Sequence, residues 1–407
     1  MKKIIKKASV ITVILLIAVQ YSYSQSWVEL QSNTGNHLFG IDFKSENMGI
    51  SVGQGGVIMA TTNGGLLWYP QQSGTNNDLN SIDMIGDSIV FLAGQNGTII
   101  STTNLGMSWG AVSSGTVRDL NSIFFISNQT GWASGNEGTL VYTANGGSTW
   151  KSQMTGTMRD LNAVSFTGMT GWAVGDNGTI IYSNNNGMIW SAQESGTDRD
   201  LLGLRVLNSQ TAFAVGTRGT IRKTTNAGMS WEDRNSRTTE DLHSIFFISG
   251  NTTGYAAGHS GIIIKTTDAG NTWFILQSPT DRELRSMVFV NNTGYADGKN
   301  GEIIKTSVNL GITQISSEAP GGYMLEQNYP NPFNPTTIIE FDVAENGFIS
   351  LKVYDIAGKE VGNLVNENLQ RGTYKVNWNG NGLSSGVYFY TLRSAIYLET
   401  KRMILTK

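Results

Sequence analysis

Basic and acidic residues recur side by side along the chain at a period of about 41 residues, and these groups are the most able to do chemistry. A guanidinium binds carboxylates through charge-assisted hydrogen bonds, and a carboxylate accepts hydrogen bonds from hydroxyl and amide groups. Together they suit a polar peptide, a carboxylate or a glycan. The pairs are Arg118–Asp119, Arg159–Asp160, Arg199–Asp200, Glu240–Asp241 and Arg282–Glu283. A second recurring set is Glu137, Asp176, Arg218, His259 and Lys299.

The composition gives other catalytic chemistries little support. The sequence contains no Cys, which excludes thiol chemistry, disulfides and a lipid-modified N-terminal Cys. The three histidines, His37, His243 and His259, are scattered, so we expect ordinary loop or strand residues and predict no metal site and no cofactor. Paired carboxylates for glycoside hydrolysis stay open as an alternative among the loop acids, because only their separation in space identifies them.

The elements that position these residues repeat with the same period. Six tryptophans are spaced 41, 41, 40, 41 and 42 residues apart: Trp68, Trp109, Trp150, Trp190, Trp231 and Trp273. Trp27 lies 41 residues before the first of them. Each unit offers four short strands punctuated by glycines, as in "LNSIFFI" (120–126), "TGWASG" (130–135), "GTLVYTAN" (138–145) and "WKSQM" (150–154). Four strands about every 40 residues are typical of a β-propeller blade, with a β-solenoid as the alternative.

We predict an all-β, seven-bladed propeller, because seven inner strands begin at a leucine: Leu38, Leu79, Leu120, Leu161, Leu201, Leu242 and Leu284. The last unit (303–316) lacks the tryptophan, whereas the Trp27 segment has no blade before it. Both facts are explained if "WVELQ" (27–31) is the outer strand of the last blade and closes the ring. This strand order places both charged sets on one face, in the connection that enters each inner strand and in the hairpin between strands two and three.

The tryptophans end a recurring octet, such as "TTNAGMSW" (224–231), in the turn between strands three and four. Asn, Asp and Gly favour tight turns, and Trp buries a large apolar surface. We therefore interpret the octet as a structural turn on the face opposite the charged loops. Its polar and aromatic positions are Asn63, Trp68, Asn104, Trp109, Asn145, Trp150, Asn185, Trp190, Asn226, Trp231, Asp268 and Trp273.

The octet resembles the Asp-box, or bacterial neuraminidase repeat, S/T-x-D-x-G-x-x-W. Five of the six good copies carry Asn in place of Asp, and only Asp268 keeps the acid. A box that tolerates loss of its charge is not a general acid or a metal ligand. Sialidases share the box, but their R-I-P stretch is absent here and no distinctive Tyr–Glu pair is found. We expect no enzyme, and a sialidase-like glycosidase is the alternative.

The whole unit "DLNAVSFTGMTGWAVGDNGTIIYSNNNGMIW" (160–190) resembles the repeat of the photosystem II assembly and stability factor family, and the resemblance covers residues 27–313. It implies a binding function in which an arginine-bearing face holds a protein partner. Here that face falls on blades three to seven, because "GNHL" (35–38) and "NNDL" (76–79) lack Arg. The candidate residues, with solvated loop caps as the alternative interpretation, are Arg118, Asp119, Arg159, Asp160, Arg199, Asp200, Arg218, Asp241, His259, Arg282 and Lys299.

The N-terminus, "MKKIIKKASVITVILLIAVQYSYSQ", has the basic, apolar and small-residue regions of a secretory signal peptide, and its apolar stretch is too short to span a membrane. Removing residues 1–24, which carry four lysines and no acid, changes the formal charge from −3 to −7. A mildly acidic exported protein is a poor nucleic-acid binder, because phosphate contacts need clustered basic charge.

The C-terminal segment resembles the type A sorting domain of the type IX secretion system. The resemblance rests on "NYPNPFNP" (328–335), "VYDIAGKEV" (353–361), "GTYKVNW" (372–378), "SGVYFY" (385–390) and the terminal "KRMILTK". Alternating strands and glycine turns indicate a small antiparallel β-sandwich. The resemblance implies transport across the outer membrane by the secretion machinery, followed by cleavage or surface attachment.

We therefore expect a signal peptide (1–24), a propeller (25–313), a linker (314–322) and a sorting domain (323–407). The predicted function is a secreted or cell-surface module that binds an extracellular protein or peptide. The alternative is a propeller that binds or hydrolyses glycans. No nucleic-acid partner and no membrane span are expected.

Overall fold

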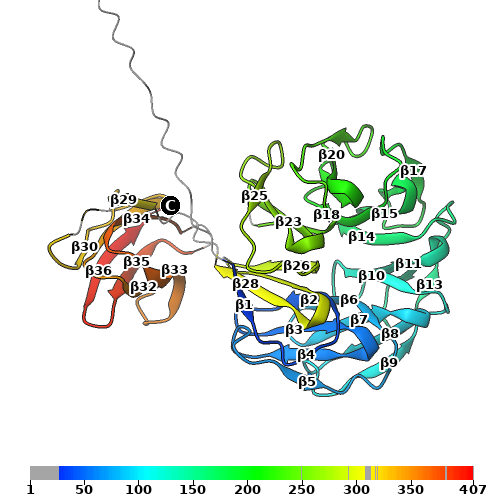
Figure 1. The fold of residues 1–407 in the computed structure, drawn as a ribbon, viewed down its shortest axis with the longest axis horizontal. Helices are drawn as coiled ribbons and strands as arrows, with labels where there is room; N and C mark the ends of the chain where they lie inside the picture. The colour runs from blue at the N-terminus through cyan, green and yellow to red at the C-terminus, as the bar shows by residue number, and fades with distance from the viewer. Residues whose placement is uncertain are drawn as a thin grey trace, which may run out of the picture. The chain divides into compact units, whose positions relative to one another are not determined.

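The computed structural model describes residues 27–248, 250–291, 293–307, 313–316, 318, 320–380 and 383–406. The predicted signal peptide (1–24) lies outside these residues. The chain divides into two compact units, one spanning Ser26–Leu310 and the other including Gly311–Lys407. In the described part of both units the regular structure consists of strands and short 3₁₀ turns (Figure 1). No helix in this part is long and apolar enough to cross a membrane.

The described residues of the first unit form seven four-stranded antiparallel sheets, numbered here in chain order. Sheets 1 to 3 comprise β2 (Leu38–Phe43), β3 (Gly49–Gly53), β4 (Ile58–Thr61) and β5 (Tyr69–Gln71); β6 (Leu79–Ile85), β7 (Ile89–Gly94), β8 (Thr98–Thr102) and β9 (Gly110–Ser113); and β10 (Leu120–Phe125), β11 (Gly131–Gly135), β12 (Leu140–Thr143) and β13 (Lys151–Ser152).

Sheets 4 to 7 follow the same plan. They comprise β14 (Leu161–Thr167), β15 (Thr170–Gly175), β16 (Ile180–Ser183) and β17 (Ser191–Gln193); β18 (Leu201–Val206), β19 (Ala212–Gly216), β20 (Thr220–Thr224) and β21 (Glu232–Asp233); β22 (Leu242–Phe247), β23 (Gly254–Gly258), β24 (Ile263–Thr266) and β25 (Phe274–Leu276); and β26 (Leu284–Val290), β27 (Thr293–Gly298), β28 (Ile303–Ser307) and β1 (Trp27–Leu30).

Each inner strand begins at the leucine that the sequence predicted, and all seven leucines are fully buried. The inner strands lie against one another in chain order, and β26 lies against both β22 and β2, so the sheets surround a central axis (Figure 1). A 3₁₀ turn follows the second strand of each sheet. These turns are η1 (Gln54–Gly56), η2 (Gln95–Gly97), η3 (Asn136–Gly138), η4 (Asp176–Gly178), η5 (Thr217–Gly219), η6 (His259–Gly261) and η7 (Lys299–Gly301).

Sheet 7 joins the two ends of the unit. Strand β1 pairs antiparallel with β28, with Trp27 opposite Thr306, which is the pairing that the sequence predicted. At the boundary with sheet 1, Phe43 stacks on Tyr295 with 3.7 Å between ring centroids. The buried Ser51 hydroxyl donates a hydrogen bond of 2.6 Å to Asp297 at the same boundary. These contacts tie the last sheet to the first.

Aromatic side chains fill the spaces between neighbouring sheets. Between sheets 2 and 3, Phe91 stacks on Phe125 with 4.4 Å between centroids, and Trp150 packs edge-on against Phe125 at 5.8 Å. Each aromatic side chain of this kind buries on the order of 150–250 Å². The apolar contacts between sheets therefore supply much of the stability of a unit that has no disulfides.

The box turns join the third and fourth strands. In the turn after β20, Gly228 N–H donates to Thr224 Oγ1 at 2.8 Å, and Ser230 N–H donates to Asn226 Oδ1 at 3.0 Å. At Asp268, burial acts to raise the pKa, but hydrogen bonds from Thr272, Thr266 and Asn271 outweigh it and lower the pKa to about 2. Five box tryptophans are buried and Trp109 is partly buried. Both Asn and Asp thus hold the turn by accepting backbone hydrogen bonds.

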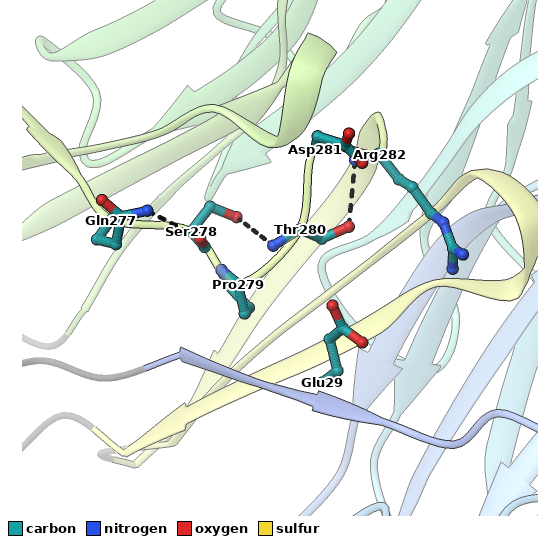
Figure 2. A pocket seen from close by; sticks show the side chains of 7 residues that line it. All are labelled: Glu29, Gln277, Ser278, Pro279, Thr280, Asp281 and Arg282. Carbon is teal, nitrogen blue, oxygen red and sulfur yellow. Dashed lines mark hydrogen bonds between the residues drawn. The ribbon is translucent and has the colours of Figure 1, made fainter.

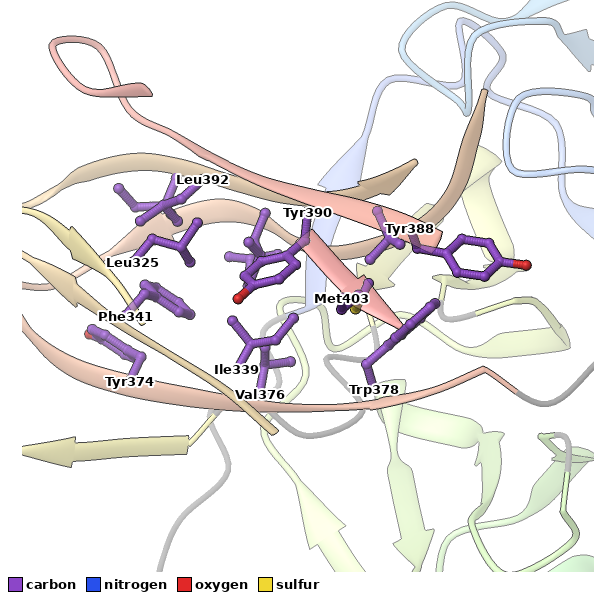
Figure 3. Close-up of a cluster of buried hydrophobic side chains, with 14 of the residues drawn as sticks. Leu325, Ile339, Phe341, Tyr374, Val376, Trp378, Tyr388, Tyr390, Leu392 and Met403 are labelled. Atoms are coloured by element: carbon purple, nitrogen blue, oxygen red, sulfur yellow. The ribbon is translucent and has the colours of Figure 1, made fainter. Parts of the chain in front are cut away.

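The second unit contains two four-stranded antiparallel sheets in its described residues. One comprises β29 (Thr313–Ser316), β34 (Gly372–Asn379), β31 (Thr336–Val343) and β30 (Met324–Leu325), and the other β33 (Glu360–Leu369), β32 (Gly347–Tyr354), β35 (Gly386–Arg393) and β36 (Leu398–Leu405). Both sheets contribute to one core, in which Phe341, Trp378, Tyr390 and Met403 are buried (Figure 3). Residues 313–316, predicted to end the propeller and begin the linker, pair with β34 in this unit.

The "NYPNPFNP" segment is anchored by its first residue. The Asn328 side chain, 1% exposed, donates hydrogen bonds to Pro330 O at 3.1 Å and to Thr337 Oγ1 at 2.9 Å. Its backbone N–H donates to the hydroxyl of Tyr390, which in turn donates to Glu326 O. Buried polar groups are stable only when bonded in this way, so the asparagine fixes the segment against the core.

Candidate functional site

Two sets of loops meet on one side of the first unit. The inbound loops lead into the inner strands, and the 3₁₀ hairpins join the second and third strands. In every sheet the residue before the inner-strand leucine accepts a hydrogen bond from the first hairpin residue, as Asp119 O does from Asn136 N–H at 2.9 Å. The contact needs a glycine, because a Cβ on Gly135 would lie 1.9 Å from that oxygen. The backbone of the two loop sets is therefore the same in all seven sheets.

Five inbound loops carry an aspartate before the leucine, and its carboxylate bonds the hairpin of the preceding sheet. In each case Oδ1 accepts the N–H of the middle hairpin residue at 2.7–2.8 Å, and the pairs are Gly55–Asp78, Asn96–Asp119, Glu137–Asp160, Asn177–Asp200 and Arg218–Asp241. The bond stabilises a left-handed backbone, such as φ of 54° at Arg218, that is strained for any residue with a Cβ. Four predicted binding residues, Asp119, Asp160, Asp200 and Asp241, thus tie neighbouring sheets together.

The predicted arginines each contact the hairpin or third strand of their own sheet. Arg118 pairs with Glu137 at 2.6 Å, and Arg282 pairs with Glu302 at 2.7 Å. The Arg199 guanidinium donates to Arg218 O at 3.2 Å, and that of Arg159 lies against the side-chain amide of Asn177. These side chains share one side of the unit, but the structure does not bring them together at a common site.

Charged side chains do converge where sheets 6 and 7 meet. Glu283, whose side chain is 5% exposed, lies at the centre. Its Oε1 is 2.6 Å from Arg285 Nε and 3.0 Å from His243 Nε2. Its Oε2 contacts Lys299 Nζ and is 3.6 Å from His259 Nδ1. We call these five residues the charged cluster.

The protonation of the charged cluster follows from burial and from the mutual charges. Burial alone would raise the pKa of Glu283, but the Lys299 hydrogen bond and the charges of Arg285 and His243 lower it below its ordinary value. Burial, together with Arg285, lowers the pKa of His243 to about 4. At neutral pH the cluster therefore holds the Glu283 carboxylate and a neutral His243 beside the basic side chains of Arg285 and Lys299.

A central cavity of about 190 Å³ lies between the inner strands of all seven sheets. On one side it is lined by His243 and Arg285. On the other side it is lined by three side-chain amides, Asn80, Asn121 and Asn162, one residue after the leucine of sheets 2 to 4. Each amide donates to a carbonyl of the next sheet, as Asn162 Nδ2 does to Leu201 O at 3.0 Å. We call these three residues the amide arc.

Further along the inner strands, two acids and one arginine occupy equivalent positions. Burial raises the pKa of Asp42 to about 6, although its bonds from Met84 and Phe43 N–H oppose the shift. Burial and the nearby Asp42 charge raise the pKa of Asp83 well above its ordinary value. Arg205 packs over the Phe246 ring at 4.2 Å. Asp83 accepts a hydrogen bond from Phe125 N–H at 2.6 Å. The two acids therefore bond backbone N–H groups on the free edges of the neighbouring inner strands.

A second cavity, of about 450 Å³, opens beside the loop that enters sheet 7 (Figure 2). It is lined by Glu29 of β1 and by loop residues 277–282, which bond to one another, as in Thr280 N–H to Ser278 Oγ at 3.4 Å. Figure 2 shows the Glu29 carboxylate and the Arg282 guanidinium on the same side of this cavity. Arg282 is already paired with Glu302, so its guanidinium has a partner within the protein.

Of the predicted binding residues, His259 and Lys299 are the two that belong to the charged cluster. His243, Glu283 and Arg285 complete the cluster without having been proposed as site residues. The signal was present as departures from the repeat, among them Glu283 at a position that is Asp in five sheets and Arg285 at a position that is Asn in three sheets. Among the described residues, no group of three or more His, Asp or Glu is placed to hold a metal ion.

Two family models match the sequence. The one described as photosynthesis system II assembly factor YCF48 matches residues 19–117, 108–196 and 188–282. The one described as a secretion system C-terminal sorting domain matches residues 327–406. No curated protein matches the sequence.

Solved structures resemble the first unit. YCF48 bound to D1 peptide is 17% identical with a TM-score of 0.60, covering 69% of this chain and 96% of that chain. YCF48 from Cyanidioschyzon merolae is 18% identical with a TM-score of 0.59, covering 69% and 98%. The WD40 β-propeller domain of Doa1 is 12% identical with a TM-score of 0.58, covering 70% and 97%. At these identities the likeness shows a β-propeller fold and does not identify a ligand.

Proposed function

The chain belongs to the photosynthesis system II assembly factor YCF48 family, and from this premise we propose that it is an exported module that binds a peptide segment of a partner protein. Its C-terminal sorting domain directs it through type IX secretion to the cell surface or the medium. The observation that carries the proposal is the charged cluster, because it is the place on the loop side where several side chains converge. A solved YCF48 carries a D1 peptide, which supports a peptide as the ligand class.

The seven sheets are, in this proposal, the blades of one closed propeller. The β1–β28 pairing, the Phe43–Tyr295 stack and the Ser51–Asp297 bond support closure between the first and last sheets. The sorting domain is a two-sheet sandwich that folds as a separate domain. Deleting residues 27–31 should then lower the melting temperature strongly, since sheet 7 would lose its outer strand. An unchanged melting temperature would contradict closure by this strand.

The module is proposed to bind without catalysis. Five of the loop carboxylates are bonded to backbone N–H groups, as Asp160 is to Glu137 and Asp241 is to Arg218. Such bonds fix each carboxylate in a structural role. A panel of fluorogenic glycosides is the direct check. Turnover that disappears when one loop carboxylate is replaced would overturn the binding-only function.

The binding function is tested with two matched double variants of the full mature chain. Arg285→Gln with Lys299→Gln removes two cations of the cluster, and Arg118→Gln with Arg159→Gln removes two cations of the same side outside it. Both variants and the parent protein are used to capture partners from the native surface fraction. Loss of a captured partner with the first variant alone supports the site. Equal recovery with all three proteins would contradict it.

A further inference from the structure

Glu283 is the exception among seven equivalent inbound positions. Five of these positions hold an aspartate that bonds the preceding hairpin, and in sheet 1 His37 Nδ1 accepts Asn300 N–H at 3.0 Å in the same way. The backbone of Glu283 is placed like the others, since its carbonyl accepts Lys299 N–H at 3.0 Å and a Cβ on Gly298 would lie 1.9 Å from it. Within the described hydrogen bonds, its carboxylate makes none to a hairpin N–H. One extra methylene group carries this carboxylate into the cations instead.

The cations around Glu283 exceed what one carboxylate can satisfy. Arg285 and Lys299 both contact this one carboxylate. Arg285 Nε and His243 Nε2 lie 2.6 Å and 3.0 Å from Oε1, yet neither makes an aligned hydrogen bond, and both nitrogen atoms are buried. A buried polar nitrogen without an aligned partner is unfavourable, because its hydrogen bond to water is lost and not fully replaced. Two such nitrogens beside one carboxylate leave room for a second polar group.

The adjoining cavity limits what that acceptor can be. Its volume of about 190 Å³ is below the roughly 300–1,000 Å³ of pockets that enclose a whole small ligand. Arg285 and His243 belong to the cluster and also line this cavity. A single side chain or a chain end fits such a space, whereas a folded segment does not.

We propose that the charged cluster is a carboxylate-binding site for a peptide ligand, and that Glu283 occupies it in the free protein until a ligand carboxylate displaces it. This inference rests on the proposed peptide-binding function. The ligand group is an acidic side chain or a C-terminal carboxylate. When Glu283 is displaced, the ligand carboxylate contacts Arg285 and Lys299 in its place. It also reaches the nitrogen atoms of Arg285 and His243 that lack an aligned partner. The native glutamate therefore competes with the ligand for the site. This competition lowers the affinity for weakly acidic ligands and makes the site selective for ligands that displace Glu283.

Fluorescence anisotropy with labelled peptides tests the displacement in the full mature chain. One probe is a Gly-Ser peptide with a single central Glu and an amidated C-terminus, and the other has a free C-terminus and no Glu. The Glu283→Gln variant should bind at least one probe about tenfold more tightly than the parent, equivalent to about 1.4 kcal/mol. Arg285→Gln should weaken binding of the same probe about tenfold or more. The probe that responds identifies the source of the carboxylate.

Two control variants keep the test decisive if the glutamine variant folds poorly. Glu283→Asp keeps the charge but shortens the side chain to the length found in five other inbound loops, so it should also tighten binding. Asp78→Asn changes an inbound carboxylate far from the cluster and should leave peptide affinity unchanged. Tightening in both Glu283 variants, without tightening in Asp78→Asn, supports the inference.

The failures of the two proposals are distinguishable. If Arg285→Gln loses the peptide but neither Glu283 variant tightens binding, the binding site stands and Glu283 is a structural brace. If Arg285→Gln has no effect on either probe, the site itself is wrong. Retention of an acidic polysaccharide such as polygalacturonate, with no binding of either peptide, would overturn the peptide as the ligand class.

Discussion

The amide arc and two members of the charged cluster, His243 and Arg285, occupy equivalent backbone positions on opposite sides of the same cavity, yet their side chains make different contacts. Asn80, Asn121 and Asn162 each reach the next sheet and bond a backbone carbonyl. His243 and Arg285, at the same position of sheets 6 and 7, turn to Glu283 instead. A repeat thus fixes a common scaffold, and a departure from the repeat frees side chains for binding.

The largest expected effect comes from breaking the backbone frame that both regions share. Gly175→Ala in sheet 4 and Gly298→Ala in sheet 7 would each place a Cβ 1.8–1.9 Å from the carbonyl of the inbound loop. Each should lower the free energy of unfolding by roughly 3 kcal/mol or more, because backbone cannot yield as a flexible side chain can. Chemical denaturation measures the loss. If both variants lose the same free energy of unfolding and only Gly298→Ala binds peptide less well, the shared frame and the specific site are separated. A variant with unchanged stability would contradict the shared backbone frame.

The boundary between sheets 7 and 1 should be sensitive to pH. Burial raises the pKa of Asp297 to about 7, although the Ser51 hydrogen bond opposes the shift. A raised carboxyl pKa means that the folded state binds more protons than the unfolded state between about pH 4 and pH 7. Its stability should fall as the pH rises through this window, and Asp297→Asn should recover on the order of 2 kcal/mol at pH 8. Thermal melts of both proteins at pH 5 and pH 8 measure this difference, and parallel pH profiles would contradict the prediction.

The amide arc should matter to stability and not to binding. Asn162→Ala removes hydrogen bonds to Leu201 O at 3.0 Å and to Asp176 Oδ1 at 2.9 Å. The expected cost is about 1–2 kcal/mol of unfolding free energy, because a carbonyl of the next sheet loses its partner. Peptide affinity, measured by anisotropy on the same sample, should not change. A loss of affinity as large as that of Arg285→Gln would remove the distinction between the two regions.

The smallest effect should come from the box turns, on the other side of the unit. Asp268→Asn keeps the turn acceptor that five other boxes use and removes one exposed charge. Hydrogen bonds lower the pKa of Asp268 to about 2 in the folded protein. The charged carboxylate therefore stabilises the fold fully above the pKa of the unfolded chain, and this stabilisation disappears as the pH falls to about 2. At pH 7 the variant should lose under about 1 kcal/mol, since the carboxylate is partly exposed and screened by solvent. A larger loss, or any change in binding, would give the box a role beyond the turn.

Most of the scaffold could be predicted from the sequence because a few residue types are dictated by the backbone. The leucines begin the inner strands, and Trp27 marks the strand that pairs with β28. Residues 313–316 pair with β34, and a short polar strand without an apolar pattern gives no sign of such a pairing in the sequence. The repeat period says nothing about such isolated pairings.

The site was only partly predictable. The strand order placed the inbound loops and hairpins on one side, but it could not say which charges bond backbone groups. Asp119 and Asp160 differ from Glu283 by one methylene group in an otherwise equivalent position, and that length decides between a hairpin N–H and a cation cluster. His243 was expected to be an ordinary loop or strand residue, because the three histidines are scattered in the sequence. Its contact with Glu283, 40 residues away, is set by the fold.

The central claim is that the charged cluster receives a ligand carboxylate in place of Glu283. A crystal structure of the mature chain with the better-binding acidic peptide tests it most directly. We expect a peptide carboxylate between Arg285 and Lys299, with the Glu283 side chain rotated out of the cluster. A bound peptide that lies elsewhere on the unit, with Glu283 still in contact with Arg285 and Lys299, would contradict the account.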